Sequence, residues 1–220
     1  MNDTTANFHL KNADSNYLNQ YVSDHMPRVK WVIERFGLDK IENKRVIEVG
    51  VGRGLFFANM SPTNYYVGLD AAIIPPASKL CPFLSLRADF NREDFGMLFD
   101  NEEKFDYLIA SETIEHVANI NNMMLQMKNL LKTNGTAIFT IPHHSVTHPV
   151  VMPGVFYPEQ NFKVFIEQYA WLVEDYQLYD KGWWTCCFKV RNAPMIEQKP
   201  LFWKQESKFH GQNPEAWTNL

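Results

Sequence analysis

Three glycines on alternate positions follow a short apolar run and a carboxylate in the stretch VIEVGVGRG, residues 46–54. The glycines are Gly50, Gly52 and Gly54, and the carboxylate is Glu48. Glycine takes backbone conformations that are closed to other residues, and without a Cβ it lets a ligand lie against the main chain. A carboxylate just before the turn favours a cationic ligand and disfavours a pyrophosphate. The stretch therefore predicts a turn that binds a ligand with a positive charge.

A second carboxylate, Asp70, ends the next apolar segment, YYVGLD. A carboxylate there can accept hydrogen bonds from both hydroxyls of a ribose, and each bond to a charged acceptor contributes about 1.5–3 kcal/mol. We therefore expect the ligand to carry a ribose, and we place Ala71 in the same site. A dinucleotide would require the pattern G-x-G-x-x-G, whereas Leu55 stands where its third glycine would be.

The elements that must position these residues alternate between strands and helices. Apolar runs predict strands at 45–50, 65–70, 83–89, 105–111 and 136–142, and two strands within 176–192. Helical spacing predicts helices at 17–36, 55–60, 119–132 and 161–175. We expect Pro27 to kink or divide the first helix, Gly37 to end it, and Gly135 to cap the helix at 119–132.

Such alternation predicts an α/β fold. We expect a Rossmann-like sheet of seven strands, mostly parallel, with helices on both faces and an antiparallel last strand. Ligands of such sheets bind beyond the carboxyl ends of the strands, where the glycine turn and Asp70 fall. We divide the chain into an N-terminal helical cap (1–40), a ligand-binding domain (41–192) and a tail (193–220).

These pieces together resemble the class I S-adenosylmethionine-dependent methyltransferases along roughly residues 45–142. The family's glycine loop, E/D-x-G-x-G-x-G, begins here at Glu48, and its ribose acid stands as Asp70. S-adenosylmethionine also fits the residues themselves, because it carries a ribose, an ammonium and a sulfonium. The segment between Asp70 and Phe83 is shorter than the helix usual in the family, and this leaves the adenine-side wall unassigned.

We expect three further cofactor contacts, and the first of them is implied by the resemblance. Asp89, with Phe90 beside it, stands where the family has the acid that meets the adenine amine. Ser111 would line the methionine end of the cofactor through its backbone. Tyr17 and Tyr21, on the first helix, would fold over the cofactor as a cover.

Groups that could act on a methyl acceptor follow the fourth and fifth strands. The segment SETIEHV supplies Glu112, Glu115 and His116, which would share one face of a helix. The segment PHHSVTH supplies His143, His144 and His148. We place His116 and His144 as catalytic candidates, with His144 as a general base, and His116 has an equal claim as a structural residue.

The same groups leave a metal site open. Two carboxylates and two imidazoles could bind a divalent ion. The E-x-x-E-H segment resembles that of the ubiquinone-pathway O-methyltransferases and of the small-RNA 3′-end methyltransferases, some of which hold a metal that grips vicinal hydroxyls. In many other methyltransferases the acid and the histidine only organise the start of a helix.

Composition bounds the remaining possibilities. Hydrophobic residues make up 45% of the chain and charged residues 21%, the net charge is −4, and no basic block supports binding of nucleic acid. Cys81, Cys186 and Cys187 read as reduced thiols of a cytoplasmic protein. We expect no signal peptide and no membrane span.

We therefore expect an S-adenosylmethionine-dependent enzyme that methylates an oxygen or nitrogen of a small molecule. One alternative is a metal-assisted O-methyltransferase acting on vicinal hydroxyls of an RNA 3′ end or a catechol-like compound. The others are a non-catalytic module that binds the cofactor and a nicotinamide dehydrogenase. The sequence identifies neither the acceptor nor the oligomeric state.

Overall fold

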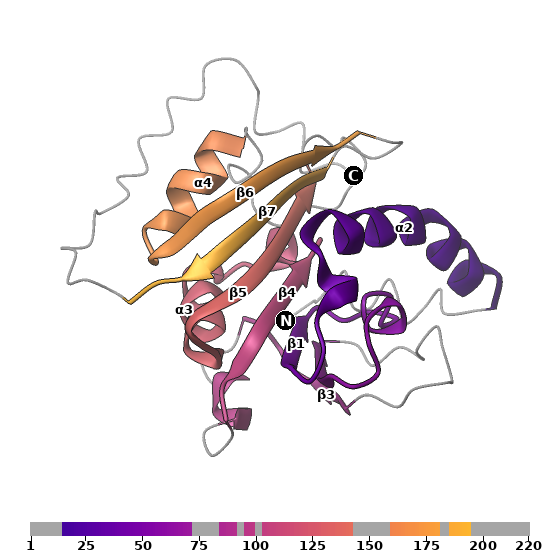
Figure 1. Cartoon of the computed structure of the whole chain (residues 1–220), viewed down its shortest axis with the longest axis horizontal. Helices are drawn as coiled ribbons and strands as arrows, with labels where there is room; N and C mark the ends of the chain where they lie inside the picture. The colour runs from indigo at the N-terminus through magenta and orange to yellow at the C-terminus, as the bar shows by residue number, and fades with distance from the viewer. Residues whose placement is uncertain are drawn as a thin grey trace.

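The computed structural model describes residues 15–71, 84–91, 95–99, 103–142, 159–180 and 185–194. Seven strands form one sheet in the order β3-β2-β1-β4-β5-β7-β6 (Figure 1). They are β1 (Arg45–Val49), β2 (Tyr65–Asp70), β3 (Leu84–Arg87), β4 (Phe105–Ser111), β5 (Leu131–Pro142), β6 (Trp171–Tyr179) and β7 (Thr185–Asn192). β1 to β5 are parallel, and β7 runs antiparallel to both β5 and β6. The predicted seven-stranded, mostly parallel sheet with an antiparallel last strand is confirmed.

Helices cover both faces of this sheet (Figure 1). α2 (Ser15–Phe36) buries Val29, Val32 and Ile33 on the face that carries Val46 and Ile109. α3 (Ile120–Leu130) and α4 (Glu159–Glu167) pack on the other face; the core there includes Met123, Met127, Phe139, Phe162 and Ile166. Short 3-10 turns complete the described elements: η1 (Leu38–Lys40), η2 (Phe57–Asn59), η3 (Phe95–Phe99) and η4 (Ile114–His116).

The first helix ends where the sequence predicted but is not divided. Gly37 follows α2 with a φ of 68°, a left-handed conformation that stops the helix. α2 nevertheless continues through Pro27 as one helix, so the predicted division there is wrong. Pro27 is exposed, and the buried residues after it hold the last turns of the helix against the sheet.

The helix predicted at 161–175 is wrong in its second half. α4 ends at Glu167, a turn follows in which Ala170 has a φ of 55°, and β6 begins at Trp171. Trp171 is fully buried, with its ring 5.3 Å from that of Phe139. Pairing with β7 and burial of the indole therefore override the local helical spacing of these residues.

Gly135 does not cap a helix. α3 ends at Leu130, β5 begins at once at Leu131, and Gly135 lies inside that strand. The pairing of β4 with β5 shifts register between Phe105 and Tyr107, and Asn134, with a φ of 63°, takes the left-handed conformation instead. The TNG segment thus forms an irregularity within a strand. A turn-forming sequence of this kind can also end a helix, so local sequence alone does not distinguish the two structures.

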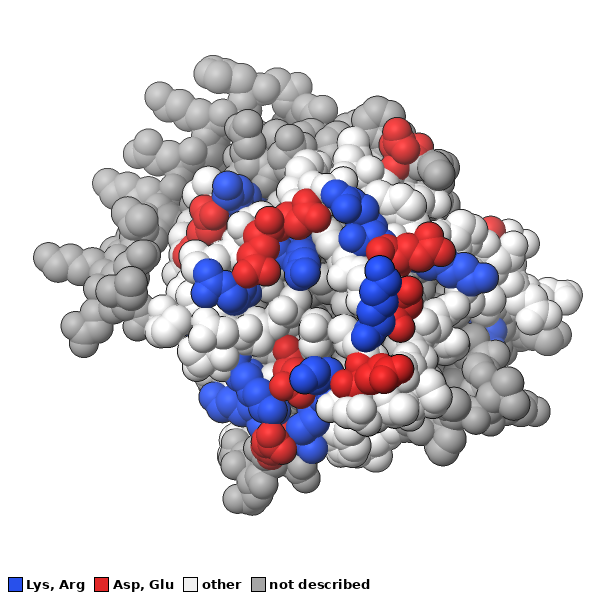
Figure 2. Space-filling view, in the orientation of Figure 1, with Lys and Arg blue, Asp and Glu red and all other residues white. Residues whose placement is uncertain are grey.

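Charges of opposite sign lie side by side on the face shown in Figure 2. Lys132 pairs with Glu103 at 2.8 Å and with Asp106 at 3.1 Å, and Arg191 pairs with Glu174 at 2.9 Å. Cys186 and Cys187 are buried thiols on β7, while Cys81 lies outside the described residues. None of the helices in the described part is both long and apolar enough to span a membrane.

Candidate active site

The glycine turn follows β1 directly, at the carboxyl edge of the sheet. β1 lies between β2 and β4, so the turn sits where the strand order reverses and ligands of such sheets bind. Gly50, Gly52 and Gly54 have φ values of 78°, 49° and 66°. The N–H groups of Gly50 and Val51 donate to the Leu69 carbonyl at 2.7 and 3.0 Å. The sequence prediction of a turn that requires glycine is confirmed.

Two side chains from distant parts of the chain lie against this turn. A Cβ on Gly50 would meet the Thr113 hydroxyl at 2.0 Å, and a Cβ on Gly52 would meet the Tyr21 hydroxyl at 3.2 Å. Thr113 follows β4, whereas Tyr21 comes from α2. Tyr21 therefore covers the turn from the side of α2. The side chain of Tyr17, which was predicted to cover the cofactor together with Tyr21, lies outside what the structure describes.

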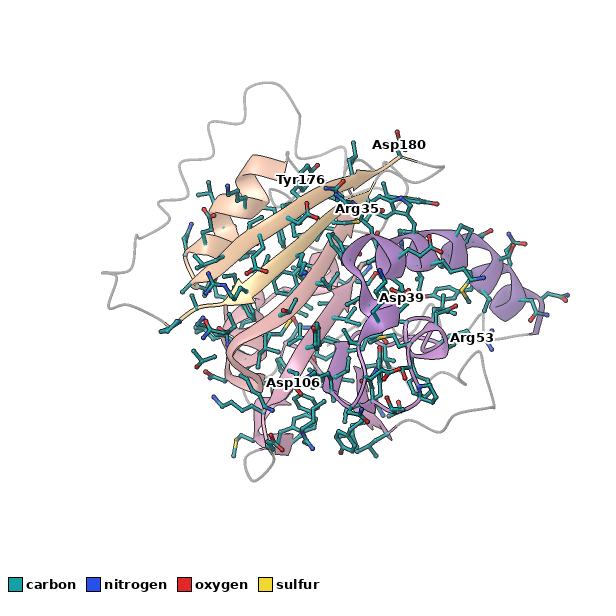
Figure 3. All side chains as sticks on the ribbon, viewed as in Figure 1. Arg35, Asp39, Arg53, Asp106, Tyr176 and Asp180 are labelled. Atoms are coloured by element: carbon teal, nitrogen blue, oxygen red, sulfur yellow. The ribbon has the colours of Figure 1, made fainter. Side chains whose placement is uncertain are left out.

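Asp70 ends β2 and closes the turn from the side. Its Oδ2 accepts a hydrogen bond of 2.7 Å from the N–H of Gly52. This bond holds the carboxylate at the end of β2 beside the glycine turn, with Ala71 next to it at the partly exposed end of the strand; its contact with a ribose stays a prediction. Arg53, labelled in Figure 3, belongs to the same turn, whereas Asp106 lies near the start of β4, at the amino edge of the sheet.

Glu48 is buried beneath the turn and does not stand alone. Only 3% of it is exposed, and Tyr66 donates a hydrogen bond to its Oε2 at 2.5 Å. Burial raises the pKa of Glu48 to about 8; the Tyr66 hydrogen bond opposes this rise, and the charge of Asp70 adds to it. Tyr66 was not predicted as a site residue. A tyrosine in an apolar strand, next to a strand that carries a carboxylate, could have indicated this hydrogen bond.

The loop after β3 holds Asp89 and Phe90. The Asp89 carboxylate accepts the Asn91 N–H at 3.0 Å, and Phe90 is buried edge-on against Phe95, with 5.6 Å between ring centres. The Asn91 side chain accepts the Ala118 N–H at 2.8 Å. This last bond ties the loop after β3 to the loop after β4.

A polar chain links the ends of β4 and β5 to α2. The Ser111 and Thr140 hydroxyls lie 2.8 Å apart, and Thr140 donates to Glu112 Oε1 at 3.1 Å. Arg28 reaches down from α2 and places its Nη1 3.3 Å from Glu112 Oε2. The ion pair therefore fastens α2 over the carboxyl edge of the sheet.

Arg28 is a candidate site residue that the sequence analysis missed. It is 7% exposed, and its Nε makes no hydrogen bond within the described part of the chain. Tyr21, His25 and Arg28 are spaced by four and three residues, which puts them on one side of a helix. The structure agrees with this spacing, because the Tyr21 and His25 rings are 4.3 Å apart. The spacing along the helix was therefore the sequence signal by which Arg28 could have been found.

The E-x-x-E-H segment does not share a helical face, so that prediction is wrong. Glu112 has a φ of 50° and precedes the short turn η4, and its carboxylate is engaged by Arg28 and Thr140. Glu115 is fully buried, and His116 Nε2 lies 3.8 Å from its Oε1.

Among the residues that the structure describes, no three potential ligands converge on a metal position. His143, His144 and His148 lie outside those residues.

Known proteins similar to this chain agree with this architecture. A family model described as a methyltransferase domain matches residues 22–181. The ubiquinone biosynthesis O-methyltransferase of Rickettsia typhi is 28% identical over 118 residues, covering 51% of this chain and 48% of the relative. That of Bartonella quintana is 32% identical over 97 residues, covering 43% and 39%. The chain spans about half the length of the curated relatives it matches or less.

Solved structures share the fold at low identity. Magnesium protoporphyrin IX methyltransferase from Synechocystis PCC 6803, with bound SAH, superposes with a TM-score of 0.58 at 11% identity, covering 87% of this chain and 96% of that one. The N-methyltransferase NodS from Bradyrhizobium japonicum, in complex with S-adenosylhomocysteine, gives 0.56 at 16% identity, covering 76% and 86%.

The strand order, the glycine turn after β1 and the acid that closes it define the class I S-adenosylmethionine-dependent methyltransferase fold. Since the family model covers most of its length, this chain belongs to the methyltransferase-domain family.

Proposed function

We propose that this protein transfers the methyl group of S-adenosylmethionine to an oxygen or nitrogen atom of a small molecule. The observation that carries the proposal is the turn of three left-handed glycines, closed by Asp70 and roofed by Tyr21. A roofed turn suits a cofactor whose transferable group must be kept from water. The names of the relatives, O-methyltransferases of ubiquinone biosynthesis, support oxygen as the first acceptor atom to test.

In this proposal each end of the cofactor has a charged or polar partner. Asp70 accepts the ribose hydroxyls, while Asp89 and Phe90 lie at the adenine end. The aminoacyl end carries an ammonium and a carboxylate. In this arrangement Glu48 binds the ammonium and the Arg28 guanidinium binds the carboxylate. The Arg28 Nε is available for this contact, because it has no acceptor among the described residues. Gly50, Gly52, Gly54, Ala71 and the backbone of Ser111 complete the lining.

Methyl transfer from a sulfonium is an in-line displacement whose leaving group is already activated. The protein's part is to align the acceptor atom with the methyl group and to exclude water. The Arg28–Glu112 ion pair serves this end because it holds α2, and with it Tyr21, over the turn. A hydroxyl acceptor also needs its proton removed, and we assign this step to a general base on the segment after β5.

The acceptor class is tested by supplying methyl-labelled S-adenosylmethionine with a panel of small phenols, alcohols and amines. We expect label in at least one hydroxyl or amine compound, with equal release of S-adenosylhomocysteine. Each reaction is repeated with a chelator, and survival of activity removes the metal-assisted alternative. A protein that binds S-adenosylhomocysteine but methylates no compound of the panel would contradict the proposal and favour a non-catalytic module.

The general base is tested by His144→Ala. We expect the variant to lose about 100-fold or more in kcat while its dissociation constant for S-adenosylhomocysteine stays unchanged. Single-turnover kinetics and calorimetry measure the two quantities separately. His116→Ala is the comparison, because His116 lies beside the buried Glu115 and we expect it to affect the stability of the loop after β4. An unchanged kcat for His144→Ala would remove His144 as the base.

A further inference from the structure

We infer that Tyr66 is a positioning residue of the cofactor site, which holds the Glu48 carboxyl under the glycine turn and favours the ionised form that a cationic ligand requires. The inference rests on the proposed contact between Glu48 and the ammonium of S-adenosylmethionine. It assigns Tyr66, the second residue of β2, a role in cofactor binding through another residue.

The geometry of β1 and β2 fixes the pair. The two strands are parallel, with Val46 opposite Tyr66 and Glu48 opposite Gly68. Residues two apart on a strand share one face of the sheet, so Tyr66 lies on the same face as Glu48, and Gly68 puts no side chain between them. The Tyr66 hydroxyl donates to Glu48 Oε2 at 2.5 Å.

The tyrosine ring is itself held in place. Tyr66 is 4% exposed, and its ring centre lies 5.0 Å from that of Phe57 on η2, the 3-10 turn that follows the glycine loop. A buried ring packed against Phe57 has little freedom to move its hydroxyl, so the carboxyl is oriented before any ligand arrives. Such orientation lowers the ordering that binding itself requires.

The charges around Glu48 give the hydrogen bond a second role. Loss of water on burial and the charge of Asp70 both disfavour the carboxylate, and the Tyr66 hydroxyl favours it. Among the other described charged groups of the site, Asp70 is bonded to the Gly52 N–H, Arg28 on α2 is engaged by Glu112, and Arg53 belongs to the glycine turn itself. The Tyr66 bond is therefore the contact through which β2 stabilises the carboxylate when the site holds no cofactor.

Tyr66→Phe removes this bond and keeps the buried ring. We expect the Glu48 carboxyl of the variant to ionise at a higher pH, so more of it is protonated at pH 7 and the ligand must drive the proton off. The dissociation constant for S-adenosylhomocysteine at pH 7 should rise about tenfold, as loss of one hydrogen bond to a charged acceptor implies.

The pH dependence separates this role from a structural one. We expect the ratio of the variant's dissociation constant to that of the wild type to be largest below about pH 7.5. It should approach one only above about pH 10, because the wild-type carboxyl ionises at about pH 8 and a tenfold effect places ionisation of the variant carboxyl about one pH unit higher. Titration of the ligand's own amine cancels in the ratio. The matched control is Tyr65→Phe, because Tyr65 neighbours Tyr66 on the same strand but is 44% exposed, and its ratio should stay at one throughout.

A ratio for Tyr66→Phe that is the same at every pH would overturn the inference, since merely structural damage weakens binding uniformly. Glu48→Gln is measured in parallel: if it binds S-adenosylhomocysteine as the wild type does, the Glu48 contact and this inference both fail. Methyl transfer to the acceptor panel would still be unaffected by that outcome, so the two proposals fail separately.

A measurement on the wild type covers the case in which Tyr66→Phe does not fold. Glutamate labelled at the side-chain carboxyl gives a carbon resonance for Glu48, which is assigned by its loss in Glu48→Gln. Its titration midpoint should move to lower pH when S-adenosylhomocysteine binds. A midpoint that stays in place would equally overturn the inference.

Discussion

Replacing Asp70 with alanine is expected to weaken binding of S-adenosylhomocysteine at least about a hundredfold while the protein stays folded. Two hydrogen bonds from ribose hydroxyls to a charged acceptor would be lost, each contributing about 1.5–3 kcal/mol. The carboxylate also accepts the Gly52 N–H at 2.7 Å, so the variant should also loosen the turn that we propose to bind the cofactor. Isothermal titration calorimetry gives the affinity, and thermal unfolding without ligand reports the fold.

Asp70→Asn divides these two effects. The amide oxygen can still accept the Gly52 N–H, but the amide carries no charge and offers one acceptor atom instead of two. We expect an intermediate loss of about tenfold, with the unfolding midpoint of the wild type. An unchanged dissociation constant in Asp70→Ala would place the ribose elsewhere and contradict the proposed cofactor site.

The parts of the site that could be predicted from sequence are those fixed by local backbone requirements. Gly50 and Gly52 stand where the chain must turn with positive φ at the end of a strand, and only glycine does so without strain. Asp70 ends the neighbouring parallel strand, so the topology of the sheet alone brings it to the turn. Alternating strands and helices were enough to predict the sheet that positions both.

The contacts that could not be predicted depend on which side chains meet across the sheet. Glu48 carries the charge that suggested a cationic ligand, yet burial raises the pKa of its carboxyl to about 8, and the Tyr66 hydrogen bond only partly opposes that rise. Arg28 reads as one more cation on an amphipathic helix until α2 is docked and brings it to Glu112. Neither partner is close in the sequence, so no local pattern pairs them.

The spacing of Glu112, Glu115 and His116 shows how a local pattern misleads. Positions i, i+3 and i+4 share a face only on a regular helix, and Glu112 adopts a left-handed conformation just before one short 3-10 turn. The Glu112 carboxylate then contacts the Thr140 hydroxyl from β5 and the Arg28 guanidinium from α2. The Glu112 backbone N–H donates to the Thr140 carbonyl. Tertiary contacts therefore decide the geometry of this segment.

The close approach of Thr113 to the glycine turn leads to the second large expected effect. In Gly50→Ala the new Cβ would lie 2.0 Å from the Thr113 hydroxyl and 2.5 Å from its methyl group, at a φ of 78°. Gly37→Ala is the matched control, because Gly37 also has a positive φ, 68°, but nothing lies within 4 Å of its Cβ position. We expect Gly37→Ala to lose about 1–2 kcal/mol of unfolding free energy from left-handed strain alone.

Gly50→Ala should lose that amount and about 1–3 kcal/mol more from overpacking, together with most of its affinity for the cofactor, for which we propose this backbone as the binding surface. Thr113→Ala in the Gly50→Ala background deletes the hydroxyl and the methyl group and should restore part of the stability but not the left-handed strain. Because the Thr113 hydroxyl also donates to the Ser111 carbonyl at 3.0 Å, a full double-mutant cycle in urea is needed to isolate the clash. Equal losses for Gly37→Ala and Gly50→Ala, with no recovery in the double variant, would mean that Thr113 does not pack against the turn. The cofactor would then have more room between β1 and β4 than this structure allows.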